Sequence, residues 1–381
     1  MMFNFDYFNP TKILFGKDRL SELDCEIPND SRIMLVYGQG SAVRSGLIDR
    51  IRDILGDRIV GEFFGIEANP RFNTLMEGVD RISACGADFL LAVGGGSVMD
   101  GTKFMALASQ YEGDDLLSYL KSYRLGSCVD TALPLGVVCT LPATGSEMNC
   151  GGVISHEDGK FYFSSPLVFP KFSFLDPTLT FTLPREQVAN GIVDAFVHII
   201  EGYVTRNVEA RFQDRACEGL LRTLIEVGRK SMDNPEDYDS RANLVWCSTM
   251  ALNGMLSVGT PEDWRGHMLG HQLTASFGFD HGKSLAVVMP SLWSVARDEK
   301  RAKILQFGER VFDIVGEASE EDETIDRIIE RLREFFESLE VKTRFSDYGM
   351  GQEEVEVILA GLAKYGQGEP SFNRCVLELA I

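Results

Sequence analysis

Hydrophobic residues in the first half of the chain gather in short runs that end in glycine-rich turns. The clearest runs are Arg32–Tyr37, Phe89–Val93 and Leu135–Leu141, and residues with a helical hydrophobic pattern follow them. A buried apolar strand that leads through glycines into a helix is the repeating unit of a parallel α/β sheet. We therefore predict an α/β domain whose ligands bind at the carboxyl ends of the strands.

The hydrophobic pattern changes after Leu183 and Pro184. From Gln187 onward the apolar positions recur with helical spacing, and almost no strand candidates remain. The clearest helix is Ile325–Leu339, and Ser319 followed three residues later by Asp322 is a signal for its start. The pattern predicts two domains: residues 1–184 as an α/β dinucleotide-binding domain and residues 185–381 as a helical domain.

Composition narrows the class of partner. The 381 residues suffice for two domains, and the net charge of -20 repels phosphate backbones and anionic membrane surfaces. No stretch reaches the roughly 18–20 apolar residues of a membrane-spanning helix, and the N-terminus lacks the pattern of a signal peptide. We expect a cytoplasmic protein that binds small neutral molecules and neither nucleic acid nor membranes.

The eight cysteines are scattered along the chain without a C-x-x-C pair, and several lie in apolar runs. In a chain of this size they are expected to be reduced core residues, not disulfides or thiolate metal ligands.

The turn Gly94–Ser97 is the first candidate for a nucleotide site. Its glycines allow a pyrophosphate to approach the backbone, and the start of the next helix supplies free N–H groups. A tight turn without a ligand is the alternative, but similar turns at Gly38–Ser41 and Thr144–Ser146 favour binding. The Gly38 turn carries no acidic residue, and Arg44 lies close by, which favours NADPH over NADH; alternatively, Arg44 is a solvent-facing helix residue.

Four of the five histidines lie in the helical half, and they indicate a metal site. Asp194 and His198 are four residues apart in a helical pattern, so both lie on one helix face. His267 and His271 repeat this spacing, and His281 follows ten residues later. A single histidine in an apolar helix is usually a core residue, but two such pairs and a further histidine suit Fe²⁺, Zn²⁺, Ni²⁺ or Co²⁺.

These motifs resemble the iron-containing (group III) alcohol dehydrogenases, especially their NADPH-dependent aldehyde reductase and butanol dehydrogenase branch. The resemblance extends over nearly the whole chain and is most specific in Asn190–Thr205 and Trp264–Pro290. It implies a dehydroquinate synthase-like architecture, with a Rossmann-like α/β domain and an all-α metal-binding domain. Gln39 and Val43 depart from the family pattern at the first glycine-rich turn, which weakens the preference for NADPH.

The resemblance also implies roles for individual residues. The metal, Fe²⁺ or Zn²⁺, would be held by Asp194, His198, His267 and His281, and His271 would be an additional active-site histidine. The implied cofactor-binding residues are Gly38, Gly40, Ser41, Asn69, Gly95, Gly96, Ser97, Asp100, Thr140, Thr144, Ser146, Asn149 and Lys160.

The expected reaction is the reversible reduction of a small aldehyde to a primary alcohol by NAD(P)H, with the metal polarising the carbonyl. His271, or the cofactor ribose through a water molecule, is the candidate for proton transfer. Two other activities use the same plan: polyol oxidation as in glycerol dehydrogenase, and a lyase reaction as in dehydroquinate synthase. A non-catalytic binding protein is a more remote alternative. An edge strand near Asn4–Phe15 is expected to pair across a homodimer.

Overall fold

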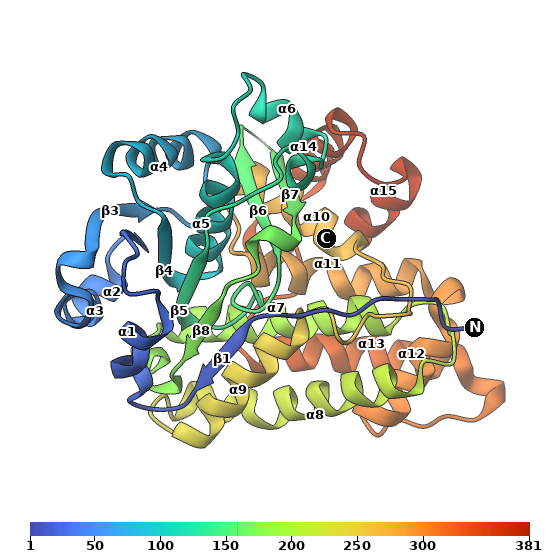
Figure 1. Ribbon diagram of the computed structural model, residues 1–381. Coiled ribbons are helices and arrows are strands. Elements are labelled where there is room, and N and C mark those ends of the chain that lie inside the picture. The colour runs from blue at the N-terminus through green and yellow to red at the C-terminus, as the bar shows by residue number, and fades with distance from the viewer. Residues whose placement is uncertain (158) are drawn as a thin grey trace. The chain divides into compact units, whose positions relative to one another are not determined.

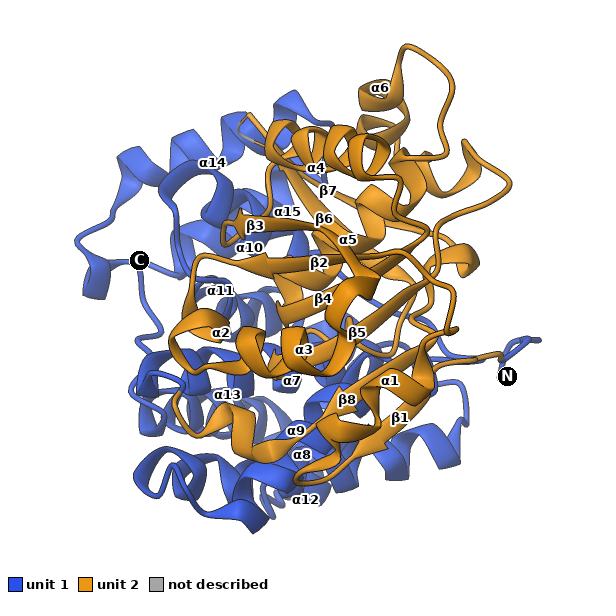
Figure 2. Ribbon diagram, turned by 60° about the vertical axis from the view of Figure 1, so that its left-hand side comes forward, with its two compact units in different colours: residues 1–7, 183–381 blue, residues 8–182 orange. Residues whose placement is uncertain are grey.

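The computed structural model describes residues 1–157 and 159–381, which form two compact units (Figure 2). One unit comprises Phe8–Thr182, and the other combines Met1–Tyr7 with Leu183–Ile381. The division falls next to Pro184, where the hydrophobic pattern changes. Residues 1–7, which the sequence assigned to the α/β domain, are grouped with the helical unit.

The α/β unit contains a six-stranded parallel sheet with the strand order β1-β8-β5-β4-β2-β3 (Figure 1). The predicted strands are confirmed as β2, β4 and β5, which lie side by side in the sheet. The strands of this sheet are β1 (Lys12–Phe15), β2 (Ile33–Gly38), β3 (Ile59–Ile66), β4 (Phe89–Gly95), β5 (Leu135–Leu141) and β8 (Phe172–Leu175). Strands β6 (Gly151–His156) and β7 (Gly159–Ser164) form a separate antiparallel pair.

Both faces of the central strands are buried, as expected for a parallel sheet that helices cover on both sides. In β2, Ile33 and Leu35 belong to a core cluster with residues of α1 and α3, and the intervening Met34 and Val36 are fully buried as well. The helices of this unit are α1 (Leu23–Glu26), α2 (Ser41–Arg44), α3 (Leu47–Leu55), α4 (Phe72–Cys85), α5 (Gly96–Ala108) and α6 (Leu116–Lys121).

From Arg185 onward the described chain contains helices and no strands, which confirms the expectation of a helical second half. The helices are α7 (Arg185–Tyr203), α8 (Arg211–Asp233), α9 (Tyr238–Ala251), α10 (Arg265–Phe277), α11 (His281–Val295), α12 (Arg297–Val311), α13 (Glu321–Ser338), α14 (Gln352–Lys364) and α15 (Pro370–Leu379). The predicted start signal of α13 is wrong: Ser319 lies in a 3₁₀ turn, Ala318–Glu320, and the helix begins at Glu321 without a side-chain cap.

Helix α7 lies within the core of the helical unit, and nearly all its residues from Val188 to Tyr203 are buried. Its buried positions include the polar residues Asp194, His198 and Glu201. Burying a charged or polar side chain is costly unless it has a partner, so this face of α7 marks a site of interaction.

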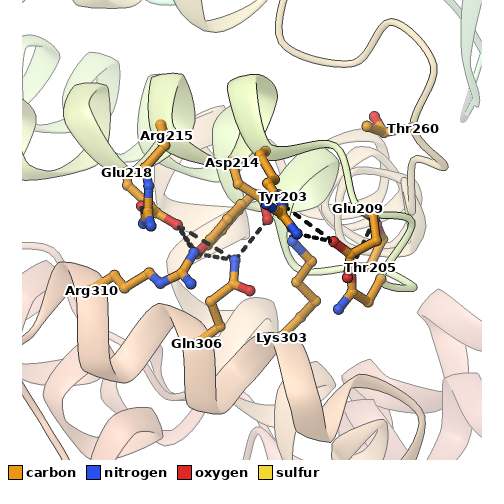
Figure 3. A network of polar contacts seen from close by, with 12 residues as sticks. Tyr203, Thr205, Glu209, Asp214, Arg215, Glu218, Thr260, Lys303, Gln306 and Arg310 are labelled. Atoms are coloured by element: carbon orange, nitrogen blue, oxygen red, sulfur yellow. Dashed lines mark hydrogen bonds and ion pairs between the residues drawn. The ribbon is translucent and has the colours of Figure 1, made fainter. Parts of the chain in front are cut away.

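A second group of buried charges in the helical unit is paired (Figure 3). The carboxylate of Glu218 on α8 accepts hydrogen bonds from Tyr203 Oη (2.8 Å), Arg215 (2.7 Å) and Arg310 (2.9 Å). Nearby, Lys303 Nζ on α12 donates to Asp214 at 2.6 Å. These contacts join α7, α8 and α12 through satisfied polar groups, so they serve packing.

None of the described helices is long and apolar enough to cross a membrane. All eight cysteines are free, as expected. The expectation that they all belong to the core is wrong, because Cys25 and Cys375 lie on exposed faces of the short helix α1 and of α15.

Candidate active site

Four side chains of the helical unit converge on one oxygen atom. Asp194 and His198 lie one turn apart on α7, His267 lies on α10, and His281 is the first residue of α11. The Nε2 atoms of His198, His267 and His281 lie 3.6, 3.7 and 3.6 Å from Oδ1 of Asp194. The structure therefore brings together the four residues that the sequence singled out as metal ligands.

The spacing of the donor atoms suits coordination of a divalent metal ion better than hydrogen bonds among these atoms. Oδ1 of Asp194 and Nε2 of His267 are buried and make no hydrogen bond within the described part of the chain. Separations of 3.6–3.7 Å are too long for hydrogen bonds. They approach the edge of about 3.4 Å in a tetrahedron whose metal–ligand bonds are about 2.1 Å long. One carboxylate and three imidazoles suit iron or zinc.

A glycine allows α11 to bring His281 to α7. A Cβ atom at Gly282 would lie 2.5 Å from the backbone oxygen of Asn190, one turn before Asp194. Because only glycine lacks that atom, the start of α11 packs against the backbone of α7. This contact holds His281 beside Asp194.

The glycine-rich turns of the α/β unit follow three neighbouring strands and therefore lie along one sheet edge. Gly38 ends β2, Gly95 ends β4, and Gly96 begins α5. A Cβ atom at Gly96 would lie 2.6 Å from Cγ2 of Thr144, so the turns after β4 and β5 pack closely only with glycine here. The N-terminus of α5 leaves backbone N–H groups for an anion.

Among the further predicted cofactor residues, Asn69 contacts the start of α5 and Lys160 contacts Asn69. The backbone N–H of Asn69 donates to Ser97 Oγ at 3.2 Å, and Lys160 Nζ donates to Asn69 Oδ1 at 2.8 Å. Asn69 adopts a left-handed conformation with φ of 58°. These contacts gather a hydroxyl, an amide and an ammonium group within one hydrogen-bonded cluster in the α/β unit.

The first glycine-rich turn carries a nearby cation. Gly40 has φ of 118°, a conformation that favours glycine, and Ser41 begins α2. A guanidinium nitrogen of Arg44 lies 3.2 Å from the position that a Cβ atom of Gly40 would occupy. Arg44 is solvent-exposed, yet its charged group lies next to this turn.

A buried network connects α5 to the loop after β5. Lys103 Nζ donates to Ser146 Oγ, Asn149 Oδ1 and the carbonyl oxygen of Gly151, each at 2.9 Å. Asp100 accepts from Ser146 Oγ at 2.6 Å through one oxygen and from the Val153 N–H at 2.9 Å through the other. Burial lowers the pKa of Lys103 to about 8, although the charge of Asp100 opposes the shift. The network fixes the loop that carries Ser146 and Asn149.

Comparison with known proteins identifies the family. Residues 10–177 match the family described as iron-containing alcohol dehydrogenase, and residues 188–371 match the C-terminal region of the Fe-containing alcohol dehydrogenase family. The chain belongs to the iron-containing alcohol dehydrogenases. The resemblance predicted from the sequence is thereby confirmed.

Individual relatives agree with this assignment. The chain is 49% identical to the NADPH-dependent aldehyde reductase YqhD of Escherichia coli, over 98% of this chain and 96% of that protein. It is 40% identical to a probable NADH-dependent butanol dehydrogenase of Bacillus subtilis, over 94% and 92% of the two chains.

Solved structures share the fold. A crystal structure of YqhD from Escherichia coli matches with a TM-score of 0.96 and 46% identity, over 100% of this chain and 99% of that chain. The NADH-dependent butanol dehydrogenase A of Thermotoga maritima matches with a TM-score of 0.93 and 32% identity, over the same shares of the two chains. The predicted fold class, an α/β domain followed by a helical domain, is confirmed.

Within the iron-containing alcohol dehydrogenase site, the electrostatics favour a cation. Burial opposes the charge on Asp194, but attraction by the imidazoles of His198, His281 and His267 prevails and lowers its pKa below the ordinary range. Burial also opposes protonation of His267, yet the carboxylates of Glu201 and Asp194 raise its pKa to about 9. A bound metal ion would supply the positive charge that these carboxylates favour, in place of the proton on His267.

His271 lies beside the metal-ligand group. It is one turn after His267 on α10, and its ring centroid lies 5.0 Å from that of His281 and 5.9 Å from that of His267. The ligand atoms of Asp194, His267 and His281 all lie within 4.8 Å of one another. Neither His198 nor His271 belongs to this group, but Nε2 of His198 lies 3.6 Å from Oδ1 of Asp194.

Glu201 is a residue of this site that the sequence reasoning missed. It is 2% exposed, and its carboxylate contacts His267 Nδ1 as well as the backbone N–H groups of Gly266 and His267, at 2.7 and 3.1 Å. Its position in the sequence carries a signal: Glu201 follows Asp194 by seven residues, two helical turns later on the same face. The missed residue Lys103 similarly follows Asp100 by three residues.

Proposed function

We propose that this chain is a metal-dependent oxidoreductase that reversibly reduces small aldehydes to primary alcohols with NADPH. The observation that carries the proposal is the convergence of three imidazole nitrogens on Oδ1 of Asp194. Membership of the iron-containing alcohol dehydrogenases supports it, as do relatives whose names denote aldehyde reductase and butanol dehydrogenase.

Asp194, His198, His267 and His281 would hold one divalent ion, Fe²⁺ or Zn²⁺. When bound, the ion supplies a Lewis acid for the carbonyl oxygen, and the nicotinamide supplies the hydride. The chain contributes a preorganised set of ligands with one negative charge, of which Asp194, His198 and His267 are buried and His281 is partly exposed.

His271 is our candidate for moving the proton that the alcohol oxygen gains or loses. An imidazole titrates near neutral pH, so it is suited to general acid–base catalysis. Its ring lies next to that of His281, on the same helix as His267 but outside the group of metal ligands.

Gly95, Gly96 and Ser97 would bind the pyrophosphate at the start of α5. The relatives include both NADPH- and NADH-dependent enzymes, so the choice of NADPH rests mainly on the turn at Gly38. That turn lacks the carboxylate that would repel a 2′-phosphate, and Arg44 lies beside it. The remaining cofactor contacts in the proposal are Gly38, Gly40, Ser41, Asn69, Asp100, Thr140, Thr144, Ser146, Asn149 and Lys160.

The proposed assembly is a cytoplasmic homodimer. Free cysteines are typical of a reducing compartment, which supports the cytoplasmic location.

Exposed apolar residues near the N-terminus support the homodimer. Met1, Phe5 and Phe8 expose large apolar side chains, and β1 is an edge strand of the sheet, which suits association with a second copy. Sedimentation equilibrium is expected to give twice the chain mass of 42.4 kDa, and a monomer at micromolar concentration would contradict the proposed assembly.

The function is tested by following butyraldehyde-dependent oxidation of NADPH and, in parallel, of NADH. We expect short-chain aldehydes to be reduced with NADPH as the cofactor. The kcat/KM for NADPH should be higher than that for NADH. Absence of turnover with either cofactor across a series of aldehydes, in protein whose bound metal has been verified, would refute the proposal.

A further inference from the structure

The carboxylate of Glu201 lies between two helices of the helical unit. Glu201 is near the end of α7, and one of its oxygens accepts hydrogen bonds from the N–H groups of Gly266 and His267 in the first turn of α10. Its other oxygen contacts Nδ1 of the His267 side chain. The carboxylate thus fixes both the backbone and the ring of one proposed metal ligand.

This contact determines which nitrogen of His267 carries a proton. An ionised carboxylate only accepts hydrogen bonds, so Nδ1 of His267 donates. In the neutral ring Nε2 then has a free lone pair, and this is the nitrogen that lies 3.7 Å from Oδ1 of Asp194. The contact with Glu201 therefore selects the tautomer that binds a metal through Nε2.

The position of Glu201 also affects the charge of the site. The carboxylate is buried, and the first turn of α10 provides partial positive charge as well as N–H donors. Asp194 and Glu201 together carry two negative charges, which match a divalent ion when the three imidazoles are neutral. A Cβ atom at residue 266 would lie 2.7 Å from Glu201 Oε1, so Gly266 leaves the space that the carboxylate requires.

We propose that Glu201 is a positioning residue for the metal: it orients His267, selects its Nε2-binding tautomer and supplies the second negative charge. The proposal rests on the metal site of the proposed function. Carboxylate–histidine–metal arrangements of this kind strengthen binding, and loss of the outer partner typically costs 10- to 100-fold in metal affinity.

The first test is Glu201→Gln, which keeps the size of the side chain. The amide oxygen is able to accept the N–H groups of Gly266 and His267, but its NH₂ group then faces Nδ1 of the ring. Nδ1 must accept, and the proton moves to Nε2, the ligand atom. Competition with a chromophoric chelator is expected to show Zn²⁺ binding weakened by about 10- to 100-fold. The visible spectrum of bound Co²⁺ is expected to change.

Glu218→Gln is the matched control. Glu218 is also a buried carboxylate with several donors in the helical unit, but it contacts Tyr203, Arg215 and Arg310 instead of a proposed ligand. This variant is expected to lose stability while its Zn²⁺ affinity and Co²⁺ spectrum remain those of the original chain.

A double-mutant comparison separates an effect through His267 from a purely structural effect. Adding Glu201→Gln to His267→Ala is expected to weaken Zn²⁺ binding by a smaller factor than Glu201→Gln does in the original chain, because the ring through which Glu201 acts is gone and only the loss of its charge remains. An additive loss in the double variant would contradict the proposal and indicate that Glu201 only stabilises the start of α10.

The Zn²⁺ affinity of the Glu201 variants decides whether Glu201 positions a metal ligand. Zn²⁺ affinity in Glu201→Gln within about twofold of the original chain would overturn the proposal. If this variant does not fold, Glu201→Asp replaces it: the charge remains but the shorter side chain withdraws from His267, and unchanged affinity would again overturn the proposal. Because binding is measured without substrate, an original chain that binds metal but reduces no aldehyde would refute the proposed function alone.

Discussion

Two buried carboxylates of the helical unit show how the surroundings of a single residue reveal its role. Glu218 is surrounded by hydrogen-bond donors, and its contacts are complete within the described chain. Asp194 instead faces three imidazole nitrogens at 3.6–3.7 Å without a hydrogen bond to Oδ1. A charged group that is buried without such partners indicates a ligand, and here the donor set indicates a metal ion.

Replacement of His271 tests its proposed role in proton transfer. His271→Ala is expected to retain one metal ion per chain, because His271 is not one of the three histidines whose Nε2 atoms converge on Oδ1 of Asp194. Its kcat is expected to fall by about 10²- to 10⁴-fold, the usual contribution of a general acid or base. Metal analysis and steady-state kinetics check both parts, and an unchanged kcat would exclude His271 from the reaction.

Replacement of Arg44 tests the cofactor preference. Arg44→Ala is expected to raise KM for NADPH by about tenfold, the lower range for losing a charge-assisted hydrogen bond at an exposed site. KM for NADH should remain the same, because NADH has no 2′-phosphate. Arg50→Ala removes another exposed arginine, on α3, and serves as the control. Equal effects of Arg44→Ala on both cofactors would argue against a 2′-phosphate contact.

At the scale of helices, the site depends on how closely α7, α10 and α11 approach one another. Gly282 allows the start of α11 to meet the backbone of α7, and Glu201 connects α7 to the first turn of α10. The loop before α10 also contacts the end of α7, because the backbone N–H of Asp263 donates to the carbonyl oxygen of Glu201 at 3.0 Å. These contacts hold residues that are far apart in the sequence at one point.

Gly282→Ala should disturb the approach of α11. The new Cβ would lie 2.5–2.9 Å from backbone atoms of Asn190, so the start of α11 must shift and carry His281 with it. We expect unfolding in urea to show a loss of about 1–3 kcal/mol, together with weaker Zn²⁺ binding. Gly202→Ala is the control, because a Cβ at this α7 position would contact nothing within 4 Å. Equal metal affinity in the two variants would contradict this account of the glycine.

Asp263 provides a test that depends on pH. Burial opposes its ionisation, but hydrogen bonds and charges of Arg265 and Lys300 prevail and lower the pKa of Asp263 to about 2. A carboxyl pKa that is lower in the folded than in the unfolded chain stabilises the protein above pH 4, and this stabilisation disappears as the pH falls through 2.

Asp263→Asn is therefore expected to lower the free energy of unfolding by about 2 kcal/mol at pH 7. The difference from the original chain should shrink between pH 4 and pH 2, as the carboxyl group becomes protonated. Urea unfolding at several pH values checks this, and a difference that is independent of pH would show that the ion pairs of Asp263 contribute little.

At the scale of the whole molecule, local sequence patterns predicted the features that depend on neighbouring residues, namely strands, helices and the faces that residues share. The strand Leu135–Leu141 and the change to helices after Pro184 follow from hydrophobic periodicity. The histidine and aspartate pairs were predicted from helical spacing, because residues four apart share a face. The start of α13 was mispredicted because the capping signal at Ser319 lies in a 3₁₀ turn.

The partners of the site residues could not be predicted in this way. Glu201 and His267 are 66 residues apart, and Lys103 and Asn149 are 46 residues apart. Such contacts arise only after helices and loops have packed, and neither spacing nor propensity specifies them. The sequence thus indicated the proposed ligands, and the structure was needed to identify the groups that contact them.

The central claim is that one metal ion, held by Asp194 and three histidines, is required for aldehyde reduction. The most direct measurement titrates Zn²⁺ or Fe²⁺ into metal-free protein while butyraldehyde-dependent oxidation of NADPH is followed. Turnover is expected to rise linearly and to level off at one ion per chain, whereas His281→Ala, which lacks one of the four ligands, binds the metal more weakly and gives no turnover under the same conditions. Turnover that is independent of added metal, or that persists in His281→Ala, would contradict the account.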